Sequence, residues 1–68
     1  MSEVEACVIR VMKQSKILDL DELMGDVLDI LSNRFVPEKR MLREAIERLI
    51  EKEYLRKREG KENVFEYV

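Results

Sequence analysis

Apolar residues recur at intervals of three and four over two long stretches of this 68-residue chain, and this restricts the fold more than any other feature. Because an α-helix turns once in about 3.6 residues, such spacing places the apolar side chains along one face of a helix. The pattern predicts one helix that begins near residue 20 and another whose apolar face covers residues 41–50. The apolar positions are Leu20, Leu23, Met24, Val27, Leu28 and Leu31 in the first stretch, and Met41, Leu42, Ala45, Ile46, Leu49 and Ile50 in the second.

An earlier stretch, residues 3–15, predicts a third amphipathic helix, whose apolar face carries Val4, Cys7, Val8 and Val11. Ser2 and Glu5 form a capping-box pattern, in which the serine accepts from an unpaired backbone amide and the glutamate reaches back to the helix start. Asp19 and Glu22 repeat this pattern at the start of the helix near residue 20. The sequence therefore marks two helix starts as well as three apolar faces.

Two residues interrupt the helical patterns. Gly25 lies inside the helix near residue 20, where glycine costs about 1 kcal/mol relative to alanine. A close contact between helices is one reason for a glycine at that position. Residues 32–37 then end the helix, and Pro37 is suited to the position just before or at the start of the next one.

The C-terminal part of the chain predicts a β-hairpin, with strands within residues 54–58 and 63–68 and with Gly60 in the turn. The aromatic and β-branched residues of these segments have high strand propensity. Ile17 and Leu18 could add a short third strand at the edge of the sheet.

Three helices followed by a hairpin are typical of an α+β winged-helix fold, that is, a three-helix bundle with a C-terminal β-hairpin wing. A chain of this length has room for only one thin core, so we expect a single domain over residues 1–68. Where the helices meet, we expect the core to bury Leu28, Ile46 and Leu49.

The residues that most enzymes and metal sites require are scarce in this chain. It has no histidine, one cysteine and two glycines, so it lacks an imidazole base, a thiolate zinc site and a glycine-rich phosphate loop. The aspartates at 19, 21, 26 and 29 do not have the glycine-centred spacing of a calcium loop. We therefore expect no catalytic residues, no metal and no cofactor, and we expect that the chain is not an enzyme.

The single cysteine bears on the compartment in which the protein works. Cys7 cannot form an internal disulfide, which favours a reducing compartment, and we expect a cytoplasmic and nuclear location. Because Cys7 falls on the apolar face of its helix, we interpret it as a small core residue. No apolar run approaches the roughly 20 residues needed to cross a membrane, and the acidic N-terminus does not resemble a secretory signal.

A winged helix suggests a DNA-binding domain, which would place its third helix in the major groove and its wing on the phosphate backbone of the DNA. Residues 1–33 carry three basic and seven acidic side chains, a net charge of −4, and residues 34–68 carry ten basic and eight acidic ones, a net charge of +2. This distribution is far from the basic footprint that binds phosphates. Nucleic-acid binding through the third helix and Arg56, Lys57 and Arg58 is therefore kept only as an alternative, as is a generic protein-interaction module.

Lys13 lies almost opposite the centre of the apolar face of the first predicted helix, with Ile9 and Arg10 one turn before it and Lys16 one turn after. Ile9 falls well off that apolar face, where a β-branched aliphatic side chain gains little from packing. One interpretation is a broad core face or a chance exposed aliphatic residue, since exposed apolar residues are common. The other is a surface that presents Lys13 to another protein.

Residues 6–13, Ala-Cys-Val-Ile-Arg-Val-Met-Lys, resemble the cullin neddylation motif, whose usual form is Ala-Ala-Ile-Val-Arg-Ile-Met-Lys. The resemblance continues through residues 31–35, Pro37 and residues 49–55, and it ends at residues 65–68, which are similar to the tyrosine-rich end of cullins. Several separated segments therefore agree in order and spacing over nearly the whole chain.

This resemblance implies the C-terminal winged-helix domain of a cullin, the scaffold subunit of multisubunit ubiquitin ligases. In that family, the lysine that matches Lys13 forms an isopeptide bond with a ubiquitin-like modifier, in the step called neddylation. The implied partners are this modifier and its conjugating enzyme, the RING-box subunit and the rest of the cullin scaffold. We expect Ile9, Arg10 and Lys16 to form the recognition surface around the acceptor. The chain would then be an excised domain or a small protein that has kept this fold.

The chain departs from the family pattern beside the acceptor lysine. Gln14 and Ser15 replace the usual Met-Arg, which removes one positive charge from the site. Residues 19–22, Asp-Leu-Asp-Glu, are acidic where cullins more often carry Lys, His, Gln or Asn. Both departures bear on the choice of partner rather than on the fold.

Overall fold

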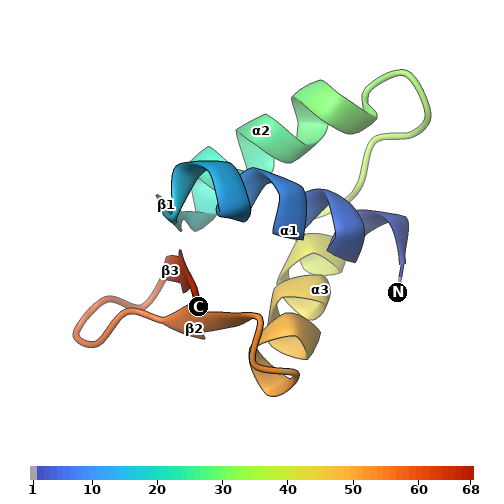
Figure 1. The fold of residues 1–68 in the computed structure, drawn as a ribbon. Coiled ribbons are helices and arrows are strands. Elements are labelled where there is room, and N and C mark those ends of the chain that lie inside the picture. Colours follow the sequence, from blue (N-terminus) through green and yellow to red (C-terminus); the bar gives the residue numbers. More distant parts are fainter. Residues whose placement is uncertain (1) are drawn as a thin grey trace.

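The structure is a computed structural model that describes residues 2–68 (Figure 1). It consists, in order, of α1 (Glu3–Ser15), β1 (Ile17–Asp19), α2 (Leu20–Leu31), α3 (Lys39–Glu51), β2 (Leu55–Lys57) and β3 (Val64–Tyr67). The predicted winged helix is therefore confirmed. The short strand predicted at Ile17 and Leu18 is also present, as β1.

The three strands form one antiparallel sheet in the order β1-β3-β2. In the register of the sheet, Leu18 lies opposite Phe65, and Arg56 lies opposite Glu66. Gly60 has a φ of 79° in the turn between β2 and β3, a backbone conformation that glycine adopts readily. The sheet lies beside the C-terminal end of α1 (Figure 1).

The core lies where α1 packs against both α2 and α3 and where β2 and β3 close the bundle. The cluster of buried side chains comprises Val4, Cys7, Val8, Val11, Met12, Leu20, Leu23, Val27, Leu31, Leu42, Ala45, Ile46, Leu49, Leu55 and Phe65. Cys7 is thus a core residue, as predicted. Burial raises the pKa of its thiol, and the nearby Arg10 offsets part of this effect.

Four apolar positions in the helical patterns are less buried than the others. Met24, Leu28 and Ile50 are only half-buried, and Met41 is 38% exposed, because they lie at the edges of their apolar faces rather than at the centres. The expectation that Leu28 is buried at the helix junction is therefore wrong. Ile46 and Leu49, at the centre of the α3 face, are buried as predicted.

A close helix contact, one possible reason for Gly25, is not found among the described residues. This residue is exposed, and a Cβ added to it would have no neighbouring atom within 4 Å. Its backbone is within α2 and does not have a positive φ. Neither packing nor backbone conformation therefore requires glycine at this position.

The two predicted capping boxes differ in the structure. At α2, Glu22 N–H donates to Asp19 Oδ1 at 2.8 Å, and Asp19 N–H donates to Glu22 Oε1 at 3.1 Å, so both halves are present. At α1, Glu5 N–H donates to Ser2 Oγ at 3.1 Å, but the Glu5 carboxylate turns toward α3. The reciprocal half of that capping box was predicted wrongly, because long-range ion pairs compete for the carboxylate.

Leu49→Ala tests the core. Leu49 is fully buried in α3, and truncating such a residue costs about 2–5 kcal/mol in the free energy of unfolding. We expect a loss of this size in urea unfolding, whereas Ile30→Ala, at a side chain that is 44% exposed, should change the same quantity far less. Equal effects of the two substitutions would mean that the core is assigned to the wrong faces.

Gly25→Ala tests the open space around Gly25. Alanine fits without a clash and reduces the entropy of the unfolded chain, so the free energy of unfolding should rise by about 0.4–1 kcal/mol. Thermal unfolding of the two proteins measures the change. A decrease in the melting temperature would show that something restricts this position after all.

Candidate functional site

A buried carboxylate fixes the position of α1 relative to α3. The Glu5 side chain is 5% exposed, and its carboxylate lies 3.4 Å from Arg48 Nη1 and 3.6 Å from Lys52 Nζ. Burial acts to raise the pKa of Glu5, but Lys52, the Ser2 hydrogen bond and Arg48 together hold that pKa below its ordinary value. Glu5 is therefore a structural anion and is not poised as a proton donor at neutral pH.

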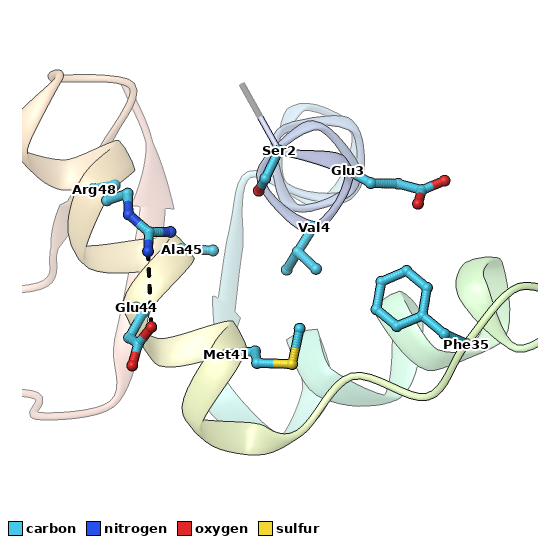
Figure 2. Close-up of a pocket in the computed structure, with 8 residues that line it drawn as sticks. All are labelled: Ser2, Glu3, Val4, Phe35, Met41, Glu44, Ala45 and Arg48. Carbon is cyan, nitrogen blue, oxygen red and sulfur yellow. Dashed lines mark ion pairs between the residues drawn. The ribbon is translucent and has the colours of Figure 1, made fainter.

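A surface hollow of about 310 Å³ lies between the N-terminal end of α1 and α3 (Figure 2). Val4, Phe35 and Met41 line its apolar part in Figure 2, and Arg48 pairs with Glu44 at its rim at 3.7 Å. The two rim charges neutralise one another. The hollow brings together no arrangement of nucleophile and base, and Lys13 does not line it.

Lys13 occupies the last turn of α1, and its side chain is exposed, as the helical pattern predicted. Arg10 and Lys16 are exposed as well. Among residues 2–68, none of the ion pairs found involves Lys13, whereas Lys39 and Lys52 pair with carboxylates at 3.3 and 3.6 Å. The ammonium group of Lys13 is therefore presented to solvent without an ion-pair partner in the described part of the chain.

Ile9 differs from our expectation. It is half-buried and packs against the core cluster, so the prediction that it lies well off the core face is wrong. Ile9 is therefore part of a broad core face. This face extends beyond the apolar centre of α1 because α2, α3 and the sheet all pack against the helix. Part of the Ile9 side chain remains accessible beside Lys13.

Lys16 ends α1 in an unusual way. Its φ is 72° and its ψ is −47°, a conformation that non-glycine residues rarely adopt. Its N–H donates to the Met12 carbonyl at 2.7 Å, and its carbonyl accepts from Tyr67 N–H at 2.8 Å. The Lys16 ammonium also lies 5.1 Å from the centre of the Tyr67 ring, within the range of a cation–π contact.

The sequence did not reveal the part that Tyr67 plays at this site. Tyr67 lies in β3, far from Lys16 along the chain, and its signals in the sequence were strand propensity and the resemblance of residues 65–68 to the end of cullins, neither of which points to Lys16. Ile17 lies opposite Glu66 in the register of β1 and β3, so Lys16 comes next to Tyr67. A correct prediction of this register would have suggested the contact. That register depends on the tertiary structure.

The basic residues available for phosphate binding are largely paired with acids. On and beside α3, Lys39 pairs with Asp21, Arg40 with Glu38, and both Arg48 and Lys52 with Glu5. In the wing, Glu66 pairs with both Arg56, at 2.8 Å, and Arg58, at 3.7 Å. These pairings weaken the nucleic-acid alternative, because most of these cations would first have to leave an existing ion pair to bind a phosphate.

The described residues form neither a metal-binding cluster nor a membrane-spanning helix. Within residues 2–68, no group of three or more histidine, cysteine, aspartate or glutamate side chains is placed to hold a metal ion. In the same part of the chain, no helix has the length and apolar character needed to span a membrane.

Comparison with known proteins identifies the family. The family model for the cullin protein neddylation domain matches residues 1–61. The chain belongs to the cullin neddylation-domain family. Among its relatives, Cullin-1 of Caenorhabditis elegans is 40% identical over 67 residues, and Cullin-3 of Schizosaccharomyces pombe is 38% identical over 66 residues. These alignments cover 98% and 97% of this chain but only 9% and 8% of the relatives, so the chain spans less than a tenth of their length.

The fold of this cullin neddylation domain also matches a solved structure. That structure, of the WHB domain of Cdc53 with Dcn1, comes from work on a dual E3 mechanism for Rub1 ligation to Cdc53. The TM-score is 0.88 at 29% sequence identity, and the match covers 96% of this chain and 74% of the other. The resemblance found in residues 6–13 therefore extends to the whole winged helix.

Glu5→Gln tests the buried ion pairs through their pH dependence. Because the pKa of Glu5 is lowered on folding, its contribution to stability is present above the ordinary glutamate pKa and is lost as the pH falls through the lowered value. The melting temperature of the Glu5→Gln variant should therefore lie below that of the wild type at pH 7, and the gap should narrow in acid.

The matched control is Glu44→Gln, which alters an exposed carboxylate that also pairs with Arg48. We expect a much smaller change in melting temperature from this variant. A gap between wild type and Glu5→Gln that stays constant from pH 7 into the acidic range would contradict a folded-state shift at Glu5.

Proposed function

We propose that this domain is the acceptor of a ubiquitin-like modifier, attached through an isopeptide bond to Lys13. The observation that carries the proposal is the exposed Lys13 on the last turn of α1, at the lysine position of the neddylation motif. The membership of this chain in the cullin neddylation-domain family supports this assignment. The fold supports it as well, because it matches the WHB domain of Cdc53, whose structure belongs to work on Rub1 ligation to Cdc53.

The transfer step follows from lysine chemistry. The neutral ε-amine of Lys13 attacks the carbonyl carbon of the thioester that joins the modifier to a cysteine of the conjugating enzyme. A C–N bond forms, the C–S bond breaks and the cysteine leaves as a thiolate, while the proton lost by the amine passes to solvent or to a base of that enzyme. No oxidation or reduction occurs, and this domain supplies only the nucleophile.

The surroundings of Lys13 suit recognition by a protein. The accessible part of Ile9 offers an apolar contact on one side, and Arg10 and Lys16 supply positive charge. Gln14, next to Lys13, is polar where the family usually has methionine. Ser15 replaces the usual arginine, which removes one positive charge. We propose that the conjugating enzyme contacts this part of α1 and that these departures tune its rate.

The wider role that we propose is that of a cullin scaffold subunit of a ubiquitin ligase. The domain would act beside a RING-box subunit and the rest of the scaffold, as a non-catalytic component in the cytoplasm and nucleus. The matched cullins are longer than this chain, and their similarity over its whole length supports the assignment. Modification at Lys13 would then change how the domain sits against its neighbours.

Lys13→Arg tests the acceptor. Arginine keeps the positive charge and the helix propensity but cannot form the isopeptide bond, so modification by reconstituted neddylation enzymes should be abolished while the melting temperature is unchanged. Intact-mass measurement gives the extent of modification, and peptide mapping gives its position. Lys16→Arg is the matched control and should remain modifiable at Lys13. Modifier found on Lys39 or Lys52 as readily as on Lys13 would refute the assignment.

A further inference from the structure

Two lysines lie three residues apart at the end of α1, yet the structure treats them differently. Lys13 is exposed on the helical surface, and no ion pair is found for it among residues 2–68. Lys16 leaves the helix with a positive φ, and its ammonium lies over the ring of Tyr67. On an ordinary helix, side chains three residues apart are neighbours, so both amines would be within reach of the same thioester.

We propose that Tyr67 is a specificity-determining residue, which directs modification to Lys13 by holding the competing amine of Lys16 over its ring. This inference rests on the proposed function of Lys13 as acceptor. It assigns to the C-terminal strand a part in the choice between two lysines on the first helix.

The backbone holds the two partners in place. The hydrogen bond from Tyr67 N–H to the Lys16 carbonyl, at 2.8 Å, joins the end of α1 to β3. β3 is the central strand of the sheet, and Tyr67 lies opposite Leu55 of β2, so Tyr67 is held from both sides. The Lys16 backbone has a positive φ, and its ammonium lies against the sheet, 5.1 Å from the centre of the Tyr67 ring.

The ring contact also stands in the way of an attack by the Lys16 nitrogen. The electrons of an aromatic face attract a cation, so the attraction acts on the ammonium and is lost by the neutral amine. To attack a thioester, the Lys16 nitrogen would have to lose both its proton and its contact with the ring. Lys13 must also lose its proton, but it has no ring contact to break, because among the described residues the cation–π contact found involves Lys16 and not Lys13.

The first experiment measures the two amines without any conjugating enzyme. Brief acetylation with an N-hydroxysuccinimide ester, followed by peptide mass spectrometry, gives the relative rates at Lys16 and Lys13. Tyr67→Leu removes the aromatic face and keeps apolar bulk, and it should raise the rate ratio of Lys16 to Lys13 roughly two- to fivefold, the change that corresponds to an exposed cation–π contact. Tyr67→Phe, which keeps the ring, is the matched control and should leave the ratio unchanged.

The second experiment uses the neddylation enzymes. In a Lys13→Arg background, Tyr67→Leu should raise any residual modification at Lys16 by the same factor, roughly two- to fivefold, relative to the chain with Tyr67 or Tyr67→Phe. Because Tyr67 packs against the core, the Leu variant could lose stability. The wild type therefore provides a further test by NMR, in which the ring current should shift the ε-protons of Lys16 upfield relative to those of Lys13.

The outcomes separate this inference from the proposed function. Equal ε-proton shifts for the two lysines, or an acetylation ratio that is the same in the Leu and Phe variants, would overturn the role of Tyr67 even if Lys13 accepts the modifier. A wild type that is not modified at Lys13, but whose acetylation ratio still depends on Tyr67, would overturn the proposed function and leave the ring contact established.

Discussion

The packing of α1 against α3 depends on the charge of Glu5. A carboxylate removed from water is strongly destabilising unless cations reach it, and these are Arg48 in the last turn of α3 and Lys52 at its C-cap. Any sliding or rotation of α1 against α3 would leave this anion buried without a partner. The ion pairs therefore act mainly against alternative packings of the same apolar faces, which the hydrophobic effect alone would tolerate.

The opposite end of α1 is held by a different kind of contact. Lys16 ends the helix, accepts a hydrogen bond from β3 and places its ammonium over Tyr67. The first helix is thus tied to α3 near its start and to the sheet at its end. Lys13 lies between these two attachments, so its backbone is held in place while its side chain keeps its freedom. That combination suits a nucleophile that an enzyme must locate and then move into its own active site.

The features that the sequence predicted well are those that depend on residues a few positions apart. The three helical faces, the capping box of Asp19 and Glu22, and the turn at Gly60 are all local, and the structure has each of them. The position of Lys13 on the outer surface follows from the same local periodicity. The family resemblance, and not the helical periodicity, indicates which reaction this lysine would undergo.

The errors have a common physical origin. Glu5 has two possible partners, the start of its own helix and the cations of α3, and only the packed structure shows that α3 prevails. Ile9 is half-buried because other parts of the chain pack against it, which the spacing of one helix does not determine. Tyr67 meets Lys16 through the register of a sheet. In each case, the deciding neighbour is remote in the chain.

The sheet order has a consequence for how the domain is made. The strand at the centre, β3, is the last element in the sequence, and both of its neighbours hydrogen-bond to it rather than to each other. During synthesis the helices emerge first, and β1 and β2 leave the ribosome before the strand that pairs them exists. The fold therefore closes only after β3 has left the ribosome. Until then, the first helix has no sheet to meet at its C-terminal end, and Lys13 lies on an unfinished domain.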